Sequence, residues 1–191
     1  MTRKYSMTTR SKQAAETKDN IIATTEQLLI NKSLKEINLK TIAEEAGTSV
    51  QTLLRHFENR EGCLNAVASV VAERVEIQRG KTDYKNIESA ISDLVDHYET
   101  EGTLVLNLLA QEKSGDIIAS KFTRVGRAFH KNWVEKCFGK YLSKKKKETI
   151  DELVVATDIY TWKILRLDLK RNQKITKNII TDITKKILEV S

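Results

Sequence analysis

The sequence contains no proline and only seven glycines among its 191 residues. Proline breaks the hydrogen-bond ladder inside a helix, and an interior glycine costs roughly 1 kcal/mol relative to alanine. Both are nearly missing, while Lys, Glu, Leu, Ile and Ala are abundant, so long helices meet few interruptions. Apolar residues make up 40% of the chain, which is enough to build a core. We therefore expect an all-α protein.

Cysteine is also scarce, because Cys63 and Cys137 are the only two. Neither belongs to a CxxC pair, and the polar N-terminus shows no secretory signal pattern. No uninterrupted apolar run reaches the ~18 residues that a membrane span needs. These absences lead us to expect a cytoplasmic protein with reduced thiols and no membrane partner.

The usual motifs of enzymes are missing as well. His56, His97 and His130 lie far apart, and none forms an HExxH motif or a metal-binding spacing with a cysteine. There is no GxSxG, P-loop or GxGxxG pattern. Cys63 lies near His56, as a thiol nucleophile and its base would, but the same segment fits a pair of short helices better. We expect no catalytic activity, no metal and no cofactor.

The first helical pattern runs from about residue 14 to residue 32. Its apolar residues recur at helical spacing and form one stripe of an amphipathic helix. The stripe consists of Ala15, Ile21, Ile22, Leu28 and Leu29.

Two short helices are predicted next, joined by a tight turn. Asn38 is a good N-cap for the first of them, because its side-chain oxygen can accept a backbone N–H. Gly47 can end that helix in a left-handed conformation, and Ser49 can cap the following one. The apolar faces of the two helices are Leu39, Ile42, Ala43 and Ala46, and then Val50, Leu53 and Phe57. Short helices, a glycine turn and small packing residues together describe a helix-turn-helix.

The rest of the chain continues in helical patterns without any alternating strand pattern. The breaks between them fall near residues 80–85, at Gly102, Gly115 and Gly139, and near residues 171–174. The sequence thus predicts about nine helices in all. The later ones are expected at about 59–78, 86–100, 103–113, 117–138, 148–170 and 176–190.

The helix-turn-helix segment resembles the tetracycline-repressor (TetR) family of regulators. The residues that carry the likeness are Ile42-Ala-Glu-Glu-Ala-Gly-Thr-Ser and Thr52-Leu-Leu-Arg-His-Phe-Glu-Asn-Arg-Glu, within a match over residues 15–65. The resemblance implies an N-terminal three-helix domain that binds DNA and a C-terminal helical domain that senses a ligand and dimerises. The expected parts are a basic disordered arm at 1–13, the helix-turn-helix domain at 14–60, and the regulatory and dimerisation domain at 61–191.

Three positions depart from the family pattern. Leu54 stands where the family usually has a tyrosine whose hydroxyl contacts a phosphate, so that contact is lost. Arg60 replaces the more usual lysine and can still hold a phosphate. Ser33 stands where glycine is common, which alters the loop and not the fold.

An α-helix fits the major groove, where each base pair presents a distinct pattern of donors and acceptors. Gln51 is the best base reader because its amide can pair with adenine, while Val50 can touch a thymine methyl. Arg55 can reach guanine or a phosphate. The alternative is that such residues are merely solvent-exposed, and that His56 caps its helix. The expected DNA contacts are Lys40, Thr48, Ser49, Val50, Gln51, Thr52, Arg55, His56 and Arg60.

The net charge of +7 suits a polyanionic partner. Lys40, His56 and Arg60 are the candidate phosphate holders. Two basic runs, at residues 1–14 and Lys144–Lys147, carry +4 each. The first can neutralise phosphates ahead of the reading domain, and a solvated, disordered tail is the alternative. The second run is more typical of a solvated helix start or loop.

A dimer reads two half-sites of a pseudo-palindrome, and the resemblance implies a homodimer joined by the last two long helices. Between residues 150 and 169 the apolar positions cover more than one helix face, so that region must be buried on several sides. An ordinary monomer core is the alternative. The expected interface residues are Leu153, Ile164, Leu167, Ile180, Ile183 and Ile187.

The resemblance also implies a small hydrophobic or amphipathic effector. Aromatic residues with a few polar groups are typical of small-molecule pockets, and equally of helical cores. The candidate pocket residues are Tyr98, Asn107, Gln111, Phe129, Trp133, Tyr160 and Trp162. The sequence therefore predicts a ligand-responsive repressor that binds a palindromic double-stranded DNA operator as a homodimer. The alternative is a regulator of the same fold that a protein partner controls, with no small-molecule inducer.

Overall fold

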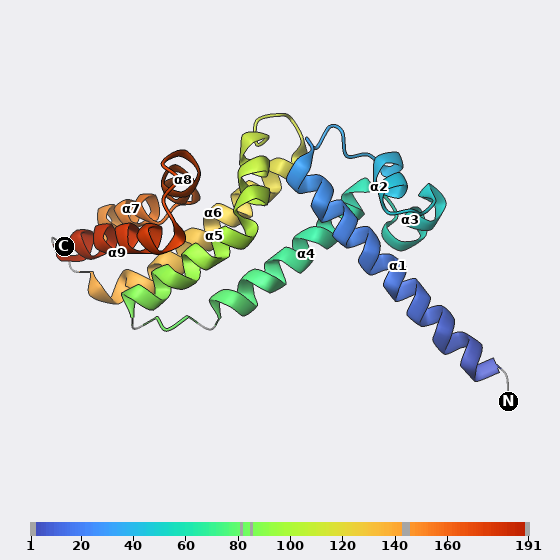
Figure 1. The fold of residues 1–191 in the computed structure, drawn as a ribbon, viewed down its shortest axis with the longest axis horizontal. Helices are drawn as coiled ribbons and strands as arrows, with labels where there is room; N and C mark the ends of the chain where they lie inside the picture. The colour runs from blue at the N-terminus through green and yellow to red at the C-terminus, as the bar shows by residue number, and fades with distance from the viewer. Residues whose placement is uncertain (1–2, 81, 85, 143–145, 190–191) are drawn as a thin grey trace. The chain divides into compact units, whose positions relative to one another are not determined.

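The computed structural model describes residues 3–80, 82–84, 86–142 and 146–189, with side chains from residue 10 onward except that of residue 146. Helices are the only regular secondary structure in these ranges, so the all-α prediction is confirmed (Figure 1). The chain divides into two compact units. The first unit comprises Met1–Ala72 and Ala110–Ser120, and the second comprises Glu73–Leu109 and Lys121–Ser191.

The first unit is built on four helices. They are α1 (Arg3–Asn31), α2 (Leu39–Glu45), α3 (Val50–Phe57) and the first part of α4 (Arg60–Arg79). Helix α1 begins earlier than the predicted start near Ala14, because residues 3–13 contain no proline or glycine that would stop it. The predicted basic arm is therefore the beginning of α1, apart from residues 1–2, which lie outside the described residues.

Only part of the predicted stripe on α1 is buried. Ile21, Leu28 and Leu29 lie in the core of the first unit, whereas Ala15 is exposed. The sequence places a domain boundary after residue 60, while the compact units divide at Ala72, inside the continuous helix α4. Residues 110–120 also return to the first unit, which no local pattern in the sequence indicates.

The second unit contains most of the later helices. They are α5 (Ile87–Ala110), α6 (Ile117–Phe138), the 3-10 turn η1 (Gly139–Tyr141), α7 (Lys146–Ala156), α8 (Ile159–Lys163), the π-helical turn η2 (Ile164–Asp168) and α9 (Gln173–Glu189). Two predicted boundaries are wrong. Gly102 does not interrupt α5, and the single helix expected at 148–170 is divided at Thr157, where Asp158 caps α8 through a bond from Tyr160 N.

The core of the second unit explains why a glycine is tolerated inside α5. The indole of Trp162 lies so close to Gly102 that a Cβ there would be 2.7 Å from two ring carbons. The same indole donates from Nε1 to Glu99 Oε1 at 2.8 Å. The largest fully buried side chains around it include Ile91, Leu94, Phe138, Leu153 and Ile180. Each contributes roughly 1.5–3 kcal/mol by its burial.

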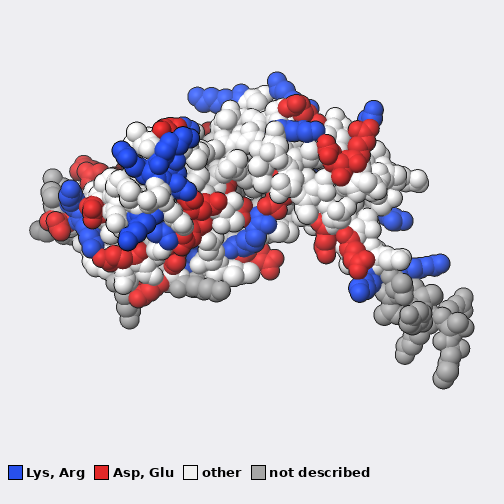
Figure 2. All heavy atoms as spheres, in the orientation of Figure 1, with Lys and Arg blue, Asp and Glu red and all other residues white. Residues whose placement is uncertain are grey.

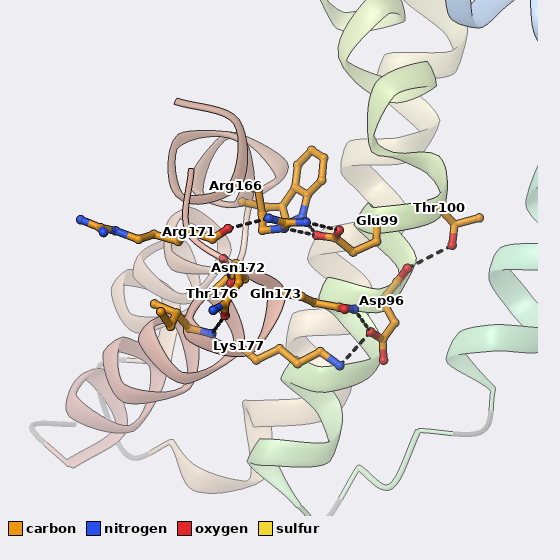
Figure 3. Close-up of polar contacts among 11 residues, drawn as sticks. Asp96, Glu99, Thr100, Arg166, Arg171, Asn172, Gln173, Thr176 and Lys177 are labelled. Carbon is orange, nitrogen blue, oxygen red and sulfur yellow. Dashed lines mark hydrogen bonds and ion pairs between the residues drawn. The ribbon is translucent and has the colours of Figure 1, made fainter. Parts of the chain in front are cut away.

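A polar network ties η2 and α9 to α5 (Figure 3). Arg166 donates to both carboxylate oxygens of Glu99, at 2.6 and 2.7 Å. Asp96, one turn earlier on α5, accepts from Gln173 at 2.5 Å and pairs with Lys177 at 2.7 Å. The hydrogen bonds from Arg166 lower the pKa of Glu99. The two carboxylates therefore orient the C-terminal helices within this unit.

None of the helices in the described part of the chain is long and apolar enough to cross a membrane. The two thiols are free and buried, and desolvation raises the pKa of Cys63 to about 11 and that of Cys137 to about 12. Both are therefore protonated at neutral pH.

We predict that Gly102→Ala destabilises the protein by about 1–3 kcal/mol, because the new methyl group would overlap the indole of Trp162. The matched control is Gly126→Ala on α6, where a Cβ meets nothing within 4 Å. That change should be neutral or stabilising by up to ~1 kcal/mol. Urea unfolding of the two variants measures both effects. Equal free energies of unfolding would contradict the close contact.

Candidate nucleic-acid interface

Helix α2 is capped by hydrogen bonds at both ends. Asn38 Oδ1 accepts from Thr41 N at 3.0 Å, which confirms it as the N-cap of α2. At the other end Gly47 adopts φ +62°, and Thr48 N and Gly47 N donate to the carbonyls of Ala43 and Glu44. This is the Schellman arrangement, in which glycine takes the left-handed position without strain.

Helix α3 begins immediately after this turn. Ser49 Oγ accepts from Thr52 N at 3.1 Å, so Ser49 is the predicted N-cap. Leu53 and Phe57 are buried, as their four-residue spacing predicts. The small side chains of Ala43 and Ala46 are buried as well, which lets α2 and α3 pack closely. Leu53 and Phe57 of α3 are therefore buried inside the first unit.

The opposite face of α3 is open. Val50, Gln51 and Arg55 are exposed, and Thr52 is half-buried with its hydroxyl 3.0 Å from that of Ser49. Leu54 is also exposed, at the position where the family usually has tyrosine. The structure thus places Val50, Gln51 and Thr52 in the first turn of a short helix and Arg55 in its last turn. The first turn of such a helix is the part that approaches the bases when a helix enters the major groove.

The candidate phosphate holders differ in their surroundings. Lys40 is exposed and pairs with Glu44 one turn later, at 3.8 Å. Thr48 is half-buried beside the turn. His56 is half-buried, and its Nε2 atom is enclosed with no hydrogen-bond partner among the described residues. That nitrogen is turned away from solvent, where a phosphate would lie.

Arg60 has partners that the sequence did not indicate. Its side chain is 20% exposed, Nε donates to Ile37 O at 2.5 Å, and Nη2 donates to Leu34 O at 2.7 Å. Nη2 also lies 3.1 Å from Asp116 Oδ2. These bonds join the loop before α2, the start of α4 and the start of α6 within the first unit. The side chain of Arg60 thus connects three segments of the first unit.

The charged residues on the face drawn in Figure 2 do not form a field of one sign. Blue and red atoms are interspersed over the visible surface, apart from the grey region, which is not described.

The seven candidate pocket residues have different surroundings. Gln111 belongs to the first unit, where its Oε1 accepts from Leu34 N at 2.6 Å. Tyr160 is exposed, and Asn107 is half-buried. Tyr98 and Trp162 are core residues whose ring centroids lie 6.0 Å apart. The remaining two, Phe129 and Trp133, line a cavity of about 250 Å³ in the second unit.

The six candidate interface residues also separate. Leu153 and Ile180 are fully buried in the core of the second unit, so the prediction that they face a partner is wrong. Ile187 is half-buried. Three are exposed: Ile164, Leu167 and Ile183. Further exposed apolar residues in this region, which the sequence did not single out, are Val155, Leu169 and Ile175.

Sequence reasoning also missed Arg79, the last residue of α4. It is buried against Phe129 and Trp133 and lines the same cavity. In the sequence it looks like any surface arginine near the end of a helix. The single available signal was its position, because Arg79 continues the spacing of Val71 and Val75 along one face of α4.

Comparisons with known proteins agree with this geometry. Residues 21–67 match the model of the bacterial regulatory proteins of the tetR family. The fold is similar to that of a transcriptional regulator from Rhodococcus sp. Rha1, with a TM-score of 0.71 and 9% identity over 91% of this chain and 96% of that chain. A regulator from a Rhodococcus species assigned to the TetR family gives a TM-score of 0.66 and 14% identity over 91% and 99%. No curated protein matches by sequence.

The capped turn, the buried face of α3 and its open opposite face define a helix-turn-helix protein that binds DNA. Residues 21–67 are thus similar to the bacterial regulatory proteins of the tetR family. The likeness to the two solved structures shows that their fold extends over 91% of the chain.

We predict that Arg60→Ala lowers the free energy of unfolding by about 2–4 kcal/mol, since it leaves two backbone carbonyls and Asp116 without their charged donor. Arg55→Ala is the control, because Arg55 is exposed on α3 and its loss should change stability by less than about 0.5 kcal/mol. Thermal unfolding compares the two. An Arg60→Ala protein that is as stable as wild type but binds DNA with a flatter salt dependence would restore the phosphate role instead.

Proposed function

We propose that this protein is a repressor that binds a pseudo-palindromic operator as a homodimer and releases it when an effector binds. The observation that carries the proposal is the open face of α3, where Val50, Gln51 and Arg55 are exposed while Leu53 and Phe57 anchor the helix. A bound dimer can occlude a promoter, which makes repression the simplest outcome of operator binding.

In this proposal the contacts fall into two kinds. Gln51 pairs with an adenine edge, Val50 contacts a thymine methyl, and Arg55 reaches a guanine or a phosphate. Lys40 contacts the backbone, helped by the positive end of the α2 dipole. We assign no phosphate contact to Arg60, because its guanidinium donates to backbone carbonyls within the first unit.

The dimer is supported by the exposed apolar residues of the second unit. Ile164 and Leu167 are 50% and 40% exposed on η2, and Val155 is 69% exposed on α7. Val155 and Ile183 also line a groove of about 790 Å³ beside α7 and α9. Apolar side chains gathered in this way mark interaction surfaces in soluble proteins. A second copy of the chain is the partner that two operator half-sites require.

Selection of bound DNA from a random pool tests the proposal as a whole. We expect an enriched sequence with two inverted half-sites, centred about 10 base pairs or a multiple of that apart. Enrichment of a single half-site would contradict the dimer, and no enrichment would contradict sequence-specific regulation. A footprint that a small molecule releases favours the effector. A footprint that only a protein partner releases favours the alternative form of control.

We predict that Gln51→Ala relaxes the preference at one base position per half-site, at a cost of about 1–3 kcal/mol for the preferred base. The reason is that the amide pairs with one base edge and not with the backbone. The control is Gln27→Ala, an exposed glutamine on α1. Binding to operators substituted at each position measures the effect. Equal loss of affinity on every sequence would show that Gln51 is no base reader.

We predict that Ile164→Lys combined with Leu167→Lys shifts the protein from dimer to monomer, because two charges would be buried at the interface. The control is Ile117→Lys, an 82% exposed position in the first unit. Sedimentation equilibrium gives the molar mass of each form, and circular dichroism confirms the fold. A double variant that remains dimeric would place the interface elsewhere.

A further inference from the structure

Arg79 is a buried cation without a full set of partners. It is only 4% exposed, and its Nε and Nη1 atoms have no hydrogen-bond partner among the described residues. The guanidinium carbon lies 5.1 Å from the ring centroid of Phe129 and 5.2 Å from that of Trp133. The phenol of Tyr98 is near enough to act on the pKa of this guanidinium. The side chain is thus surrounded mainly by aromatic rings.

No carboxylate among the residues that the structure describes pairs with Arg79. Burial lowers its pKa, and the groups that act in the opposite direction are the phenols of Tyr98 and Tyr84 and the thiol of Cys137. A guanidinium nevertheless stays protonated at neutral pH. A buried charge is costly unless an opposite charge or hydrogen bonds compensate it, and cation–π contacts compensate it only in part.

Two buried histidines lie within the electrostatic reach of Arg79. Desolvation and then the charge of Arg79 lower the pKa of His97 to about 3 and that of His130 to about 4, so both rings are neutral at pH 7. Thr157 donates its hydroxyl proton to Leu153 O, so the 3.1 Å contact with His130 Nε2 requires that nitrogen to be the donor. The neutral ring of His130 therefore carries its proton on Nε2.

Several further polar atoms near Arg79 have no hydrogen-bond partner within the described part of the chain. They are Nδ1 of His97, Nδ1 of His130 and Nε1 of Trp133, all enclosed like the two nitrogens of Arg79. Buried polar atoms in folded proteins are normally hydrogen-bonded, so an unpaired set at one place calls for an explanation. Three of the five atoms are N–H donors, and the one formal charge is positive. An acceptor that carries negative charge would complement these donors.

A cavity adjoins these donors. It measures about 250 Å³, and Arg79, Phe129 and Trp133 line it together with Asn132 and Tyr84. Lys136 and Glu76 also line it, and their opposite charges balance each other. The volume lies below the range typical of drug-sized ligands, so the occupant is small. Two aromatic walls around a guanidinium suit a flat molecule with one acidic group.

We propose that this cavity binds a small organic carboxylate, whose carboxylate pairs with Arg79 while its body lies against Phe129 and Trp133. This inference rests on the proposed effector control and names the chemical class of the effector. It replaces the hydrophobic or amphipathic effector that the family resemblance implies with an anionic one. A carboxylate would bond side-on to Nε and Nη2 of Arg79, the two N–H groups that point in one direction, as the carboxylate of Glu99 bonds to Arg166.

Thermal unfolding of the full chain without DNA tests the proposal. The probes are acetate, benzoate and phenylacetate, each compared with its neutral amide. We expect at least one of the acids to raise the Tm with increasing concentration, and its amide to leave the Tm unchanged. Arg79→Met should bind that acid at least about tenfold more weakly, whereas Arg124→Met, at an exposed position on α6, should bind it as wild type does.

Arg79→Met removes an unpaired buried charge and keeps the length of the side chain, so we expect it to fold and to be at least as stable as wild type. Arg79→Lys provides a second fold control that retains the charge. No shift with any of the three acids, equal shifts with acid and amide, or an unchanged response in Arg79→Met would overturn the proposal. Stabilisation by inorganic phosphate alone would exclude the carboxylate class.

Histidine NMR titration gives an independent readout. A carboxylate beside Arg79 offsets the positive charge that lowers the pKa of His97 and His130, so both pKa values should rise on binding. Binding without any change in either histidine would locate the ligand elsewhere. Because these measurements use no DNA, acid binding by a protein that selects no operator would refute only the proposed function. Operator selection without acid binding would refute only this inference.

Discussion

The geometry of the reading helix depends on one arginine. Arg60 is the first residue of α4, and its guanidinium bonds to the carbonyls of Leu34 and Ile37 in the segment that precedes α2. Its ion-pair partner, Asp116, also accepts from Ile118 N and so caps the start of α6. Helix α3 lies between these segments in the sequence. Because a charged donor gives about 1.5–3 kcal/mol per hydrogen bond, this tie is strong enough to hold both ends of the helix-turn-helix in one orientation.

Helix α4 carries an arginine at each end, and the two are buried in different ways. Arg60 has backbone oxygens and a carboxylate for its N–H groups, so its charge is compensated within the protein. Arg79 lies against aromatic rings, and two of its nitrogens have no hydrogen-bond partner among the described residues. The same residue type thus has its charge compensated at the start of the helix and only partly compensated at its end. Arg79 lines a cavity, so its side chain has room beside it for a ligand, whereas that of Arg60 only supports the fold.

The features that could be predicted from the sequence are those set by neighbours along the chain. The caps at Asn38 and Ser49, the left-handed Gly47 and the buried pair Leu53 and Phe57 follow from local rules, and the structure confirms them. Features that depend on distant partners were not predictable in this way. From the sequence alone Gly102 is interpreted as a helix break, because its contact with the indole of Trp162 is not visible there. Arg60 is likewise interpreted as a phosphate contact, because the carbonyls that it binds are not known. Gln111 reads as a pocket residue until its bond to Leu34 is seen.

The exposed apolar residues of the second unit are another feature that the sequence alone could not predict, and the physical reason is clear. Residues 150–169 are apolar on more than one helix face, and hydrophobicity alone does not decide which face turns inward. The structure selects the side that carries Leu153 and Ile180 for the core. The choice is coupled to polar contacts, since Glu99 on α5 binds Arg166 and the indole N–H of Trp162. With Trp162 and Arg166 directed toward α5, Ile164 and Leu167 on the same stretch of chain remain exposed. Which apolar residues remain exposed is therefore determined by hydrogen bonds that orient the helix, and not by which side chains are most apolar.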